Sequence, residues 1–298
     1  MKLNYINKIK KNITISSTKK TSNILDGVYK SVYKGKSMNF ENLREYVIND
    51  DIKDIDWKAS ARSGNLYVKQ FIAEKKHNIL LIMDTGKKMD AVTDMHESKK
   101  NIALFTAGTL GYIAIKNNDY IGMIYSNQNK IEYKSFKYNL YNLEEYLCDY
   151  EKNAIVKNID INELIEYSLK TVLKKTITFI ITDIKGLNDI KSNNIKKMSI
   201  RHDVMIIVIK DNYMTGENIY DLEEMQYIPK FLLNDPKIYE TEKEAKEKIY
   251  KTKKAKLKKY NVNVVTISSI KEINNQIINL LEEHRYASKN WIKTNVFI

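Results

Sequence analysis

The chain has little of several residues that mark common protein classes. Its 298 residues include one cysteine, two prolines and nine glycines. The single Cys148 excludes an internal disulfide and fits a reducing compartment. So few glycines and prolines leave no flexible linker between independent domains. No apolar run reaches the roughly 20 residues that span a bilayer, and the first residues form no secretory signal. We therefore expect a compact cytoplasmic protein.

Arginine is also scarce, because only four of the 50 basic residues are arginines. The formal net charge is +13, yet residues 1–20 hold six lysines and no acid, and residues 241–260 hold nine lysines and three glutamates. The rest of the chain is therefore nearly neutral. The second basic segment has the spacing of a helix whose Ala245, Ile249 and Leu257 face inward. Binding of nucleic acid or of an anionic membrane surface through these segments is a less favoured alternative.

From residue 77 onward, short apolar runs alternate with segments of helical spacing. The runs cover residues 78–84, 119–125, 176–183, 203–209 and 262–268, and the helical segments cover 97–116, 162–174, 189–200 and 241–259. Continuous apolar runs are typical of strands buried on both faces. The pattern predicts an α/β fold, a doubly wound, mostly parallel sheet with helices on both faces. Residues 130–136 alternate apolar and charged side chains, which predicts an edge strand antiparallel to 119–125.

Residues 1–76 lack this alternation. Segments 12–16 and 65–73 have the composition of strands, and no helical crossover is evident between them. We expect a small N-terminal β-containing subdomain over residues 1–76 and the α/β domain over residues 77–298.

Two of the four arginines bracket a group of acids within the N-terminal segment. Arg44 and Arg62 flank Asp50, Asp51, Asp54 and Asp56. A guanidinium binds a carboxylate bidentately, so retention of arginine here favours ion pairs that hold the segment together. The alternative is a metal site for phosphoester hydrolysis formed by the four carboxylates. The interleaved Ile52, Ile55 and Trp57 predict that one side of the segment is buried and favour the structural interpretation.

Acidic residues also end the predicted strands. Asp84 ends the first strand and Asp183 the third, while Asp211 follows the fourth. Ligands of doubly wound sheets lie beyond the carboxyl ends of the strands. Here the chain resembles von Willebrand factor A-like domains, whose metal-ion-dependent adhesion site reads Asp-x-Ser-x-Ser.

This chain departs from that metal motif. Gly86 and Lys88 replace both serines, and no threonine lies at residues 158–160, where the family supplies one. Lys88 is expected near Asp84 and Asp183, where it would supply positive charge internally. We predict no divalent cation and no other cofactor at this degenerate site.

The segment from residue 35 to 89 resembles a bacterial family catalogued as domain of unknown function fifty-eight. The residues that carry the resemblance are Arg44, Tyr46, Asp50, Asp51, Asp54, Asp56, Trp57 and Arg62. The resemblance implies a von Willebrand A-like domain after this motif, and an association with MoxR-type AAA+ ATPases in assembly or maturation of other proteins. The sequence offers no P-loop, nucleophile elbow or Cys/His cluster. The leading hypothesis is a non-enzymatic adaptor that contacts a protein partner through the strand-tip face.

Overall fold

The computed structural model describes most of the chain. The described residues are 3–15, 25, 27–29, 42–48, 50, 52, 55–70, 76–128, 130–152, 160–212, 220–221, 226–227 and 236–295. Their centre is a six-stranded sheet with the order β10-β7-β6-β3-β4-β5. Its strands are β3 (Asn78–Met83), β4 (Tyr120–Asn127), β5 (Lys130–Lys137), β6 (Ile177–Asp183), β7 (Asp203–Ile209) and β10 (Asn263–Ile267). All neighbours pair in parallel except β4 and β5, which are antiparallel, as predicted.

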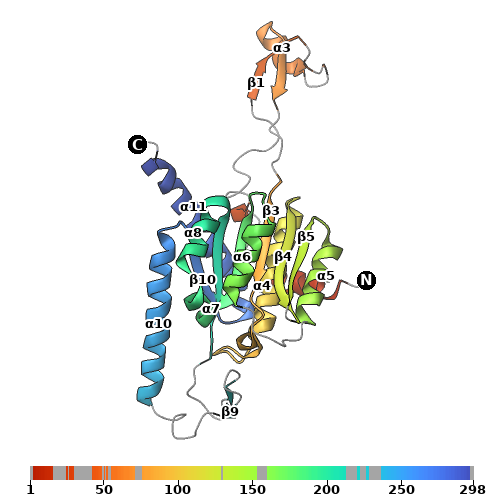
Figure 1. Cartoon of the computed structure of the whole chain (residues 1–298). Coiled ribbons are helices and arrows are strands. Elements are labelled where there is room, and N and C mark those ends of the chain that lie inside the picture. Colours follow the sequence, from red (N-terminus) through yellow and green to blue (C-terminus); the bar gives the residue numbers. More distant parts are fainter. Residues whose placement is uncertain are drawn as a thin grey trace.

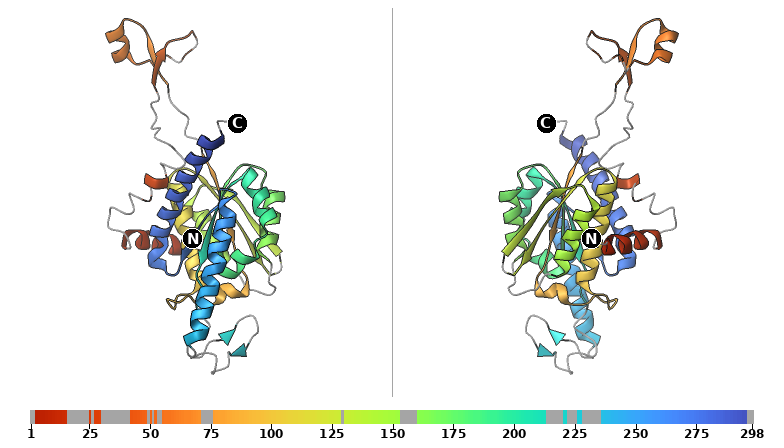
Figure 2. Two further views of the ribbon diagram at one scale, coloured as in Figure 1. Left: turned by 90° about the vertical axis from the view of Figure 1, so that its left-hand side faces the viewer. Right: turned by 90° about the vertical axis from the view of Figure 1, so that its right-hand side faces the viewer.

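Helices cover both faces of this sheet (Figures 1 and 2). One layer contains α1 (Asn4–Ile15), α4 (Lys99–Lys116), α5 (Leu140–Glu151) and α11 (Ile273–Asn295). The other contains α6 (Ile161–Thr171), α7 (Ile184–Asp189), α8 (Ser192–Arg201) and α10 (Pro236–Lys258). Alternate strand residues serve the two layers: Leu81 packs toward the α4 side, whereas Leu80 and Ile82 pack toward the α6 side. The predicted doubly wound α/β sheet is confirmed.

A second, smaller unit is formed by β1 (Asn42–Glu45), α3 (Trp57–Ser63) and β2 (Tyr67–Gln70). β1 and β2 are antiparallel. Ser60 of α3 accepts a hydrogen bond of 2.8 Å from the Tyr67 amide, and Gly64 ends the helix with φ +81, a value that glycine adopts readily. In Figure 1 this unit lies beyond the end of the sheet where β3 begins. We call it the β1–α3–β2 unit.

The described parts also include the short helical turns η2 (Lys87–Asp90) and η3 (Ile270–Glu272), and the strand pair β8 (Tyr220–Asp221) and β9 (Gln226–Tyr227).

One prediction of secondary structure was wrong, and the start of another element was misplaced. Residues 12–15 were predicted as part of a strand but belong to α1. Ile6, Ile9 and Ile13 recur at helical spacing and are buried, so the helical period decides the conformation over the β-branched composition. The helix predicted over residues 189–200 is confirmed as α8, but it begins only at Ser192, because the preceding helix α7 ends at Asp189.

The N-terminal helix belongs to the packing of the large sheet. The backbone amides of Tyr5 and Ile6 each donate a 2.8 Å hydrogen bond to the carboxylate of Glu144 on α5. Glu144 is fully buried, so it satisfies amides that the first turn of a helix leaves without partners. The division of the chain after residue 76 stays a prediction.

Candidate functional site at the strand tips

The candidate site lies where the strand order reverses. The connections from β3 run to β4 and β5 on one side, and the chain then returns to β6 on the other side of β3. Ligands of doubly wound sheets bind beyond the carboxyl ends of the strands at such a switch point. Asp84 follows β3 directly, Asp183 is the last residue of β6, and Asp211 follows β7. The sheet therefore brings these three acids to the same edge.

Asp84 is fixed by hydrogen bonds to both its backbone and its carboxylate. Its backbone amide donates to Ile181 O over 2.9 Å, and its carbonyl accepts from the Tyr150 hydroxyl over 3.0 Å. Its carboxylate accepts from the Gly86 amide over 3.0 Å and from the Thr182 hydroxyl over 2.5 Å. Asp84 is only 2% exposed, so its negative charge requires compensation within the protein.

Lys88 supplies part of that compensation. Its Nζ lies 3.3 Å from Asp84 Oδ2 and 3.3 Å from Asp183 Oδ1. Burial by itself lowers the pKa of Lys88, but the negative charges of Asp84 and Asp183 outweigh it and raise the pKa to about 12. The ammonium is therefore charged at every physiological pH.

A second ammonium, from Lys99, was missed in the sequence. Its Nζ lies 3.0 Å from Asp183 Oδ2 and also contacts Asp211, and the residue is 1% exposed. Lys99 is the first residue of α4, after the N-cap Ser98. A positive charge there opposes the helix dipole. A lysine opening an otherwise apolar helix was thus a signal that it has a buried acidic partner.

These five side chains form a continuous row of alternating charge, which we call the charge chain. Its members in order are Asp84, Lys88, Asp183, Lys99 and Asp211. Although burial favours the neutral acid, Lys99, Lys88 and the Gly186 amide hold the pKa of Asp183 below its usual range. Burial, only partly offset by Lys99, raises the pKa of Asp211. The charge chain links the ends of three strands by ion pairs.

Close packing around the charge chain depends on Gly186. A Cβ atom at this position would lie 2.8 Å from Asp84 Oδ2 and 3.0 Å from Lys88 Nζ, and would also overlap the Thr182 hydroxyl. The Gly186 amide donates to Asp183 Oδ1 over 2.8 Å. Glycine is required here by close approach of side chains, since no positive φ is involved.

The residues present do not fit a divalent cation. The carboxylates of Asp84 and Asp183 converge on the Lys88 ammonium, and Gly86 offers no side-chain oxygen. Magnesium needs about six oxygen ligands at roughly 2.0–2.1 Å. Within the described parts of the chain, no group of three or more histidine, cysteine or acidic side chains is arranged to hold a metal. The absence of a cofactor nevertheless stays a prediction.

The acids of the β1–α3–β2 unit have local partners. Arg44 binds Asp50 bidentately over 2.7 and 2.5 Å, and Asp50 also accepts from the Val47 amide over 2.9 Å. Hydrogen bonding to Arg44 lowers the pKa of Asp50. Asp56 caps α3 by accepting from the Lys58 and Ala59 amides. Two carboxylates thus serve structural roles, which counts against the hydrolase hypothesis.

The other residues of the Asp/Arg motif in the β1–α3–β2 unit agree only in part with the predicted ion pairs and buried side. Asp51 and Asp54 lie outside the described residues. Arg62 is exposed in the last turn of α3, and the described residues give it no ion pair. The prediction that the interleaved apolar residues share a buried side was wrong in part. Ile55 is 7% exposed, but Ile52 is 66% and Trp57 is 62% exposed, because the bridge from Ile55 to Val68 turns only Ile55 inward.

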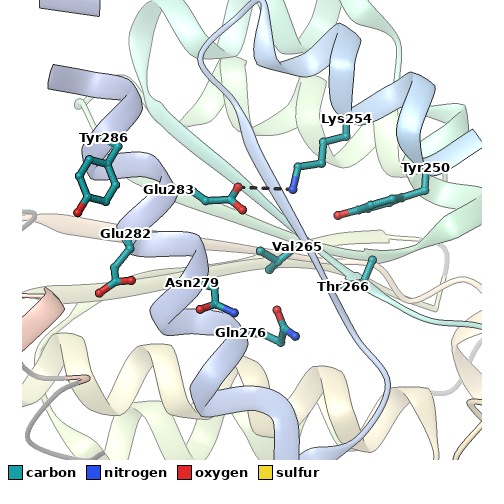
Figure 3. A pocket seen from close by; sticks show the side chains of 9 residues that line it. All are labelled: Tyr250, Lys254, Val265, Thr266, Gln276, Asn279, Glu282, Glu283 and Tyr286. Atoms are coloured by element: carbon teal, nitrogen blue, oxygen red, sulfur yellow. Dashed lines mark ion pairs between the residues drawn. The ribbon is translucent and has the colours of Figure 1, made fainter. Parts of the chain in front are cut away.

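A polar cavity of about 310 Å³ lies between α10 and α11 over the edge strand β10 (Figure 3). Lys254 and Glu283 face each other across it at 3.5 Å. A shallow cavity of about 820 Å³ lies between α6 and α8. Neither includes a residue of the charge chain.

The lysine-rich segment is helical, as predicted, but its packing differs from the prediction. Leu257 is buried, Ile249 is half-buried and Ala245 is exposed. Lysines of α10 contact the body of the protein: Lys246 donates to Asn212 O over 2.8 Å and Lys253 donates to Ile190 O over 3.1 Å, in addition to the Lys254–Glu283 ion pair. Figure 1 shows the amino-terminal half of α10 extending past the sheet.

Comparison with known proteins places the chain in a family. It matches the family described as Protein of unknown function DUF58 over residues 42–215, more than half of its length. The chain belongs to this family. Curated relatives include the uncharacterized proteins Rv1480 of Mycobacterium tuberculosis and Mb1516 of Mycobacterium bovis, each 23% identical over 115 residues. That match covers 39% of this chain and 36% of each relative.

Solved structures with a similar arrangement include an aerotolerance-related membrane protein from Bacteroides fragilis and the VWA domain of SpRpn10. The first is 14% identical with a TM-score of 0.44, and the match covers 70% of this chain and 99% of that one. The second is 13% identical with a TM-score of 0.34, and the match covers 67% and 94%. The predicted family is confirmed, and the sheet order confirms the predicted doubly wound α/β architecture. Among the described residues, every helix is too short or too polar for a membrane span.

Proposed function

We propose that this chain is a non-enzymatic protein-interaction module whose main docking surface is the β1–α3–β2 unit. The observation that supports this is a concentration of exposed large apolar side chains in so small a unit. They are Val47 (61% exposed), Ile48 (83%), Ile52 (66%), Trp57 (62%) and Leu66 (46%). A two-stranded pair is only marginally stable alone, and such a concentration of apolar surface is typical of a protein contact.

The strand-tip face provides a second contact surface. Val92 and Met95, in the loop that precedes α4, are 41% and 58% exposed. The charge chain beneath them holds this loop region to the ends of the strands. The partner we propose is a MoxR-type AAA+ ATPase, on the strength of the family resemblance, and the role is assembly or maturation of other proteins in the cytoplasm.

Capture of a co-expressed MoxR-type ATPase tests this proposal. We expect the double variant Ile48→Ser/Trp57→Ser to lose at least about tenfold in affinity, because exposed aromatic and aliphatic anchors dominate such interfaces. The matched control is Leu173→Ser, since Leu173 is 82% exposed outside the unit. Retained capture by the double variant would exclude this surface, and no capture by the unaltered protein would exclude this partner.

Binding to nucleic acid or to an anionic membrane surface is a second candidate function, favoured by the exposed lysines of α10. Lys243, Lys248, Lys251 and Lys256 all face solvent. Such binding depends steeply on salt. Binding to single-stranded DNA or to phosphatidylserine vesicles that does not weaken between low and physiological salt would exclude it.

A further inference from the structure

The Lys88 ammonium lies at the point on which two carboxylates from different strands converge. Asp84 Oδ2 and Asp183 Oδ1 are both 3.3 Å from Nζ. The two acids are 2% and 1% exposed, so without the ammonium two buried like charges would face one another. Buried carboxylates in this arrangement require either protonation or a cation.

The surrounding backbone is compatible with the serine-containing motif of metal-binding von Willebrand A-like domains. Gly86 has φ −61 and ψ 157, an extended conformation that any L-residue adopts. Lys88 is the fourth residue after Asp84 and lies in the turn η2, from which its ammonium reaches both acids.

We propose that Lys88 is a built-in cation that permanently occupies a latent divalent-cation site, with Lys99 as the second ammonium that keeps the remaining carboxylates neutralised. The strand-tip site is consequently indifferent to divalent cations, and replacement of Gly86 and Lys88 by serine converts it into a metal site formed by Asp84, Asp183 and the two introduced hydroxyls. This inference goes beyond the proposed docking function and does not depend on it.

The distance favours a cation larger than magnesium. Calcium takes oxygen ligands at roughly 2.3–2.6 Å with flexible geometry, whereas magnesium demands roughly 2.0–2.1 Å. The carboxylate oxygens lie 3.3 Å from the ammonium nitrogen, so they have to move inward by a shorter distance to bind calcium than to bind magnesium. The variant site should therefore bind calcium more tightly than magnesium.

Calorimetric titration with calcium and with magnesium tests the proposal on the isolated protein. We expect the unaltered chain to bind neither ion. Gly86→Ser/Lys88→Ser should bind calcium at least about tenfold more tightly than any binding by the unaltered chain, and calcium should raise the melting temperature of this variant. Lys87→Ser, the same change at the neighbouring position, should gain nothing. Lys88→Met removes the charge but keeps most of the volume, so it should be destabilised without gaining a site.

Each result of the calcium titration either supports or contradicts the proposal. Calcium binding by the unaltered chain that matches the double variant would overturn the proposal, as would a folded double variant that binds no calcium. If the double variant is unfolded at rest, refolding upon addition of calcium supports the proposal and continued unfolding in about 10 mM calcium, a large excess over a micromolar site, contradicts it.

Discussion

The sharpest test of the charge chain is removal of Lys99, its most buried cation. In Lys99→Met, a side chain of similar length loses its ion pairs to Asp183 and Asp211. Removing one partner of a buried pair costs about 3–5 kcal/mol, since the other charge stays buried. Asp183 still has an ion pair with Lys88 and a hydrogen bond from the Gly186 amide in this variant. We therefore expect a loss of unfolding free energy at the lower end of this range, about 3 kcal/mol. That corresponds to a fall of about 6–12 °C in melting temperature.

Urea unfolding followed by circular dichroism measures this loss. The control is Lys100→Met, the same substitution at the half-buried neighbouring residue, which should cost under about 1 kcal/mol. If Lys99 neutralises Asp211, then Asp211→Asn should lower the free energy of unfolding less in the Lys99→Met variant than in the unaltered protein. The coupling energy of this double-mutant cycle should be at least about 1 kcal/mol. A loss below about 1 kcal/mol for Lys99→Met, or strictly additive variants, would refute the assigned role of the charge chain.

Three further predictions concern the charge chain, the cap of α1 and the packing at Gly186. Because the folded-state pKa of Asp183 is lowered, the stability that this carboxylate contributes is present above the unfolded pKa and is lost as the pH falls below about 4. The folded-state pKa of Asp211 is raised instead, so its ionisation opposes folding. Carboxyl titrations by nuclear magnetic resonance should therefore show that Asp211 is protonated before Asp183 as the pH falls. Glu144→Ala should cost about 3 kcal/mol and speed amide exchange at Ile6, whereas unchanged exchange would show that α1 does not need this cap. Gly186→Ala should cost about 1–3 kcal/mol through overlap with Asp84 and its neighbours, and thermal melting at the level of the unaltered protein would contradict that packing.

The sheet was predictable because its strands are continuous apolar runs buried on both faces. Phe179, Ile180 and Ile181 are each fully buried, so composition alone identified β6. The N-terminal helix was not predicted because the β-branched residues near Ile13 outweighed the helical spacing of the buried isoleucines, and because the carboxylate that caps the helix lies on α5, more than a hundred residues away. Local sequence carries no record of such a partner.

The site was only half predictable for a related reason. Lys88 lies four residues after Asp84, so a family pattern could align it with a lost serine. Lys99 reaches Asp183 across 84 residues, and the packing of α4 against the sheet beside β6 brings the two together. In the β1–α3–β2 unit, the spacing of Ile52 and Trp57 suggested burial, because sequence periodicity reports an apolar face without stating whether that face packs within the chain or awaits a partner.

The positions of the two apolar surfaces constrain the partner. The β1–α3–β2 unit lies beyond the amino end of β3 (Figure 1), whereas Asp84 and the loop that contains Met95 follow the carboxyl end of β3 in the sequence. β3 has six residues, and at about 3.3 Å per residue the strand alone separates the two surfaces by about 20 Å. A partner that covers both surfaces must therefore extend along at least the length of β3. If one large assembly such as an ATPase ring contacts both, Trp57→Ser and Met95→Ser should each weaken its capture, with losses of binding free energy that add within about 0.5 kcal/mol. If only Trp57→Ser weakens capture, the strand-tip face is left for a different partner.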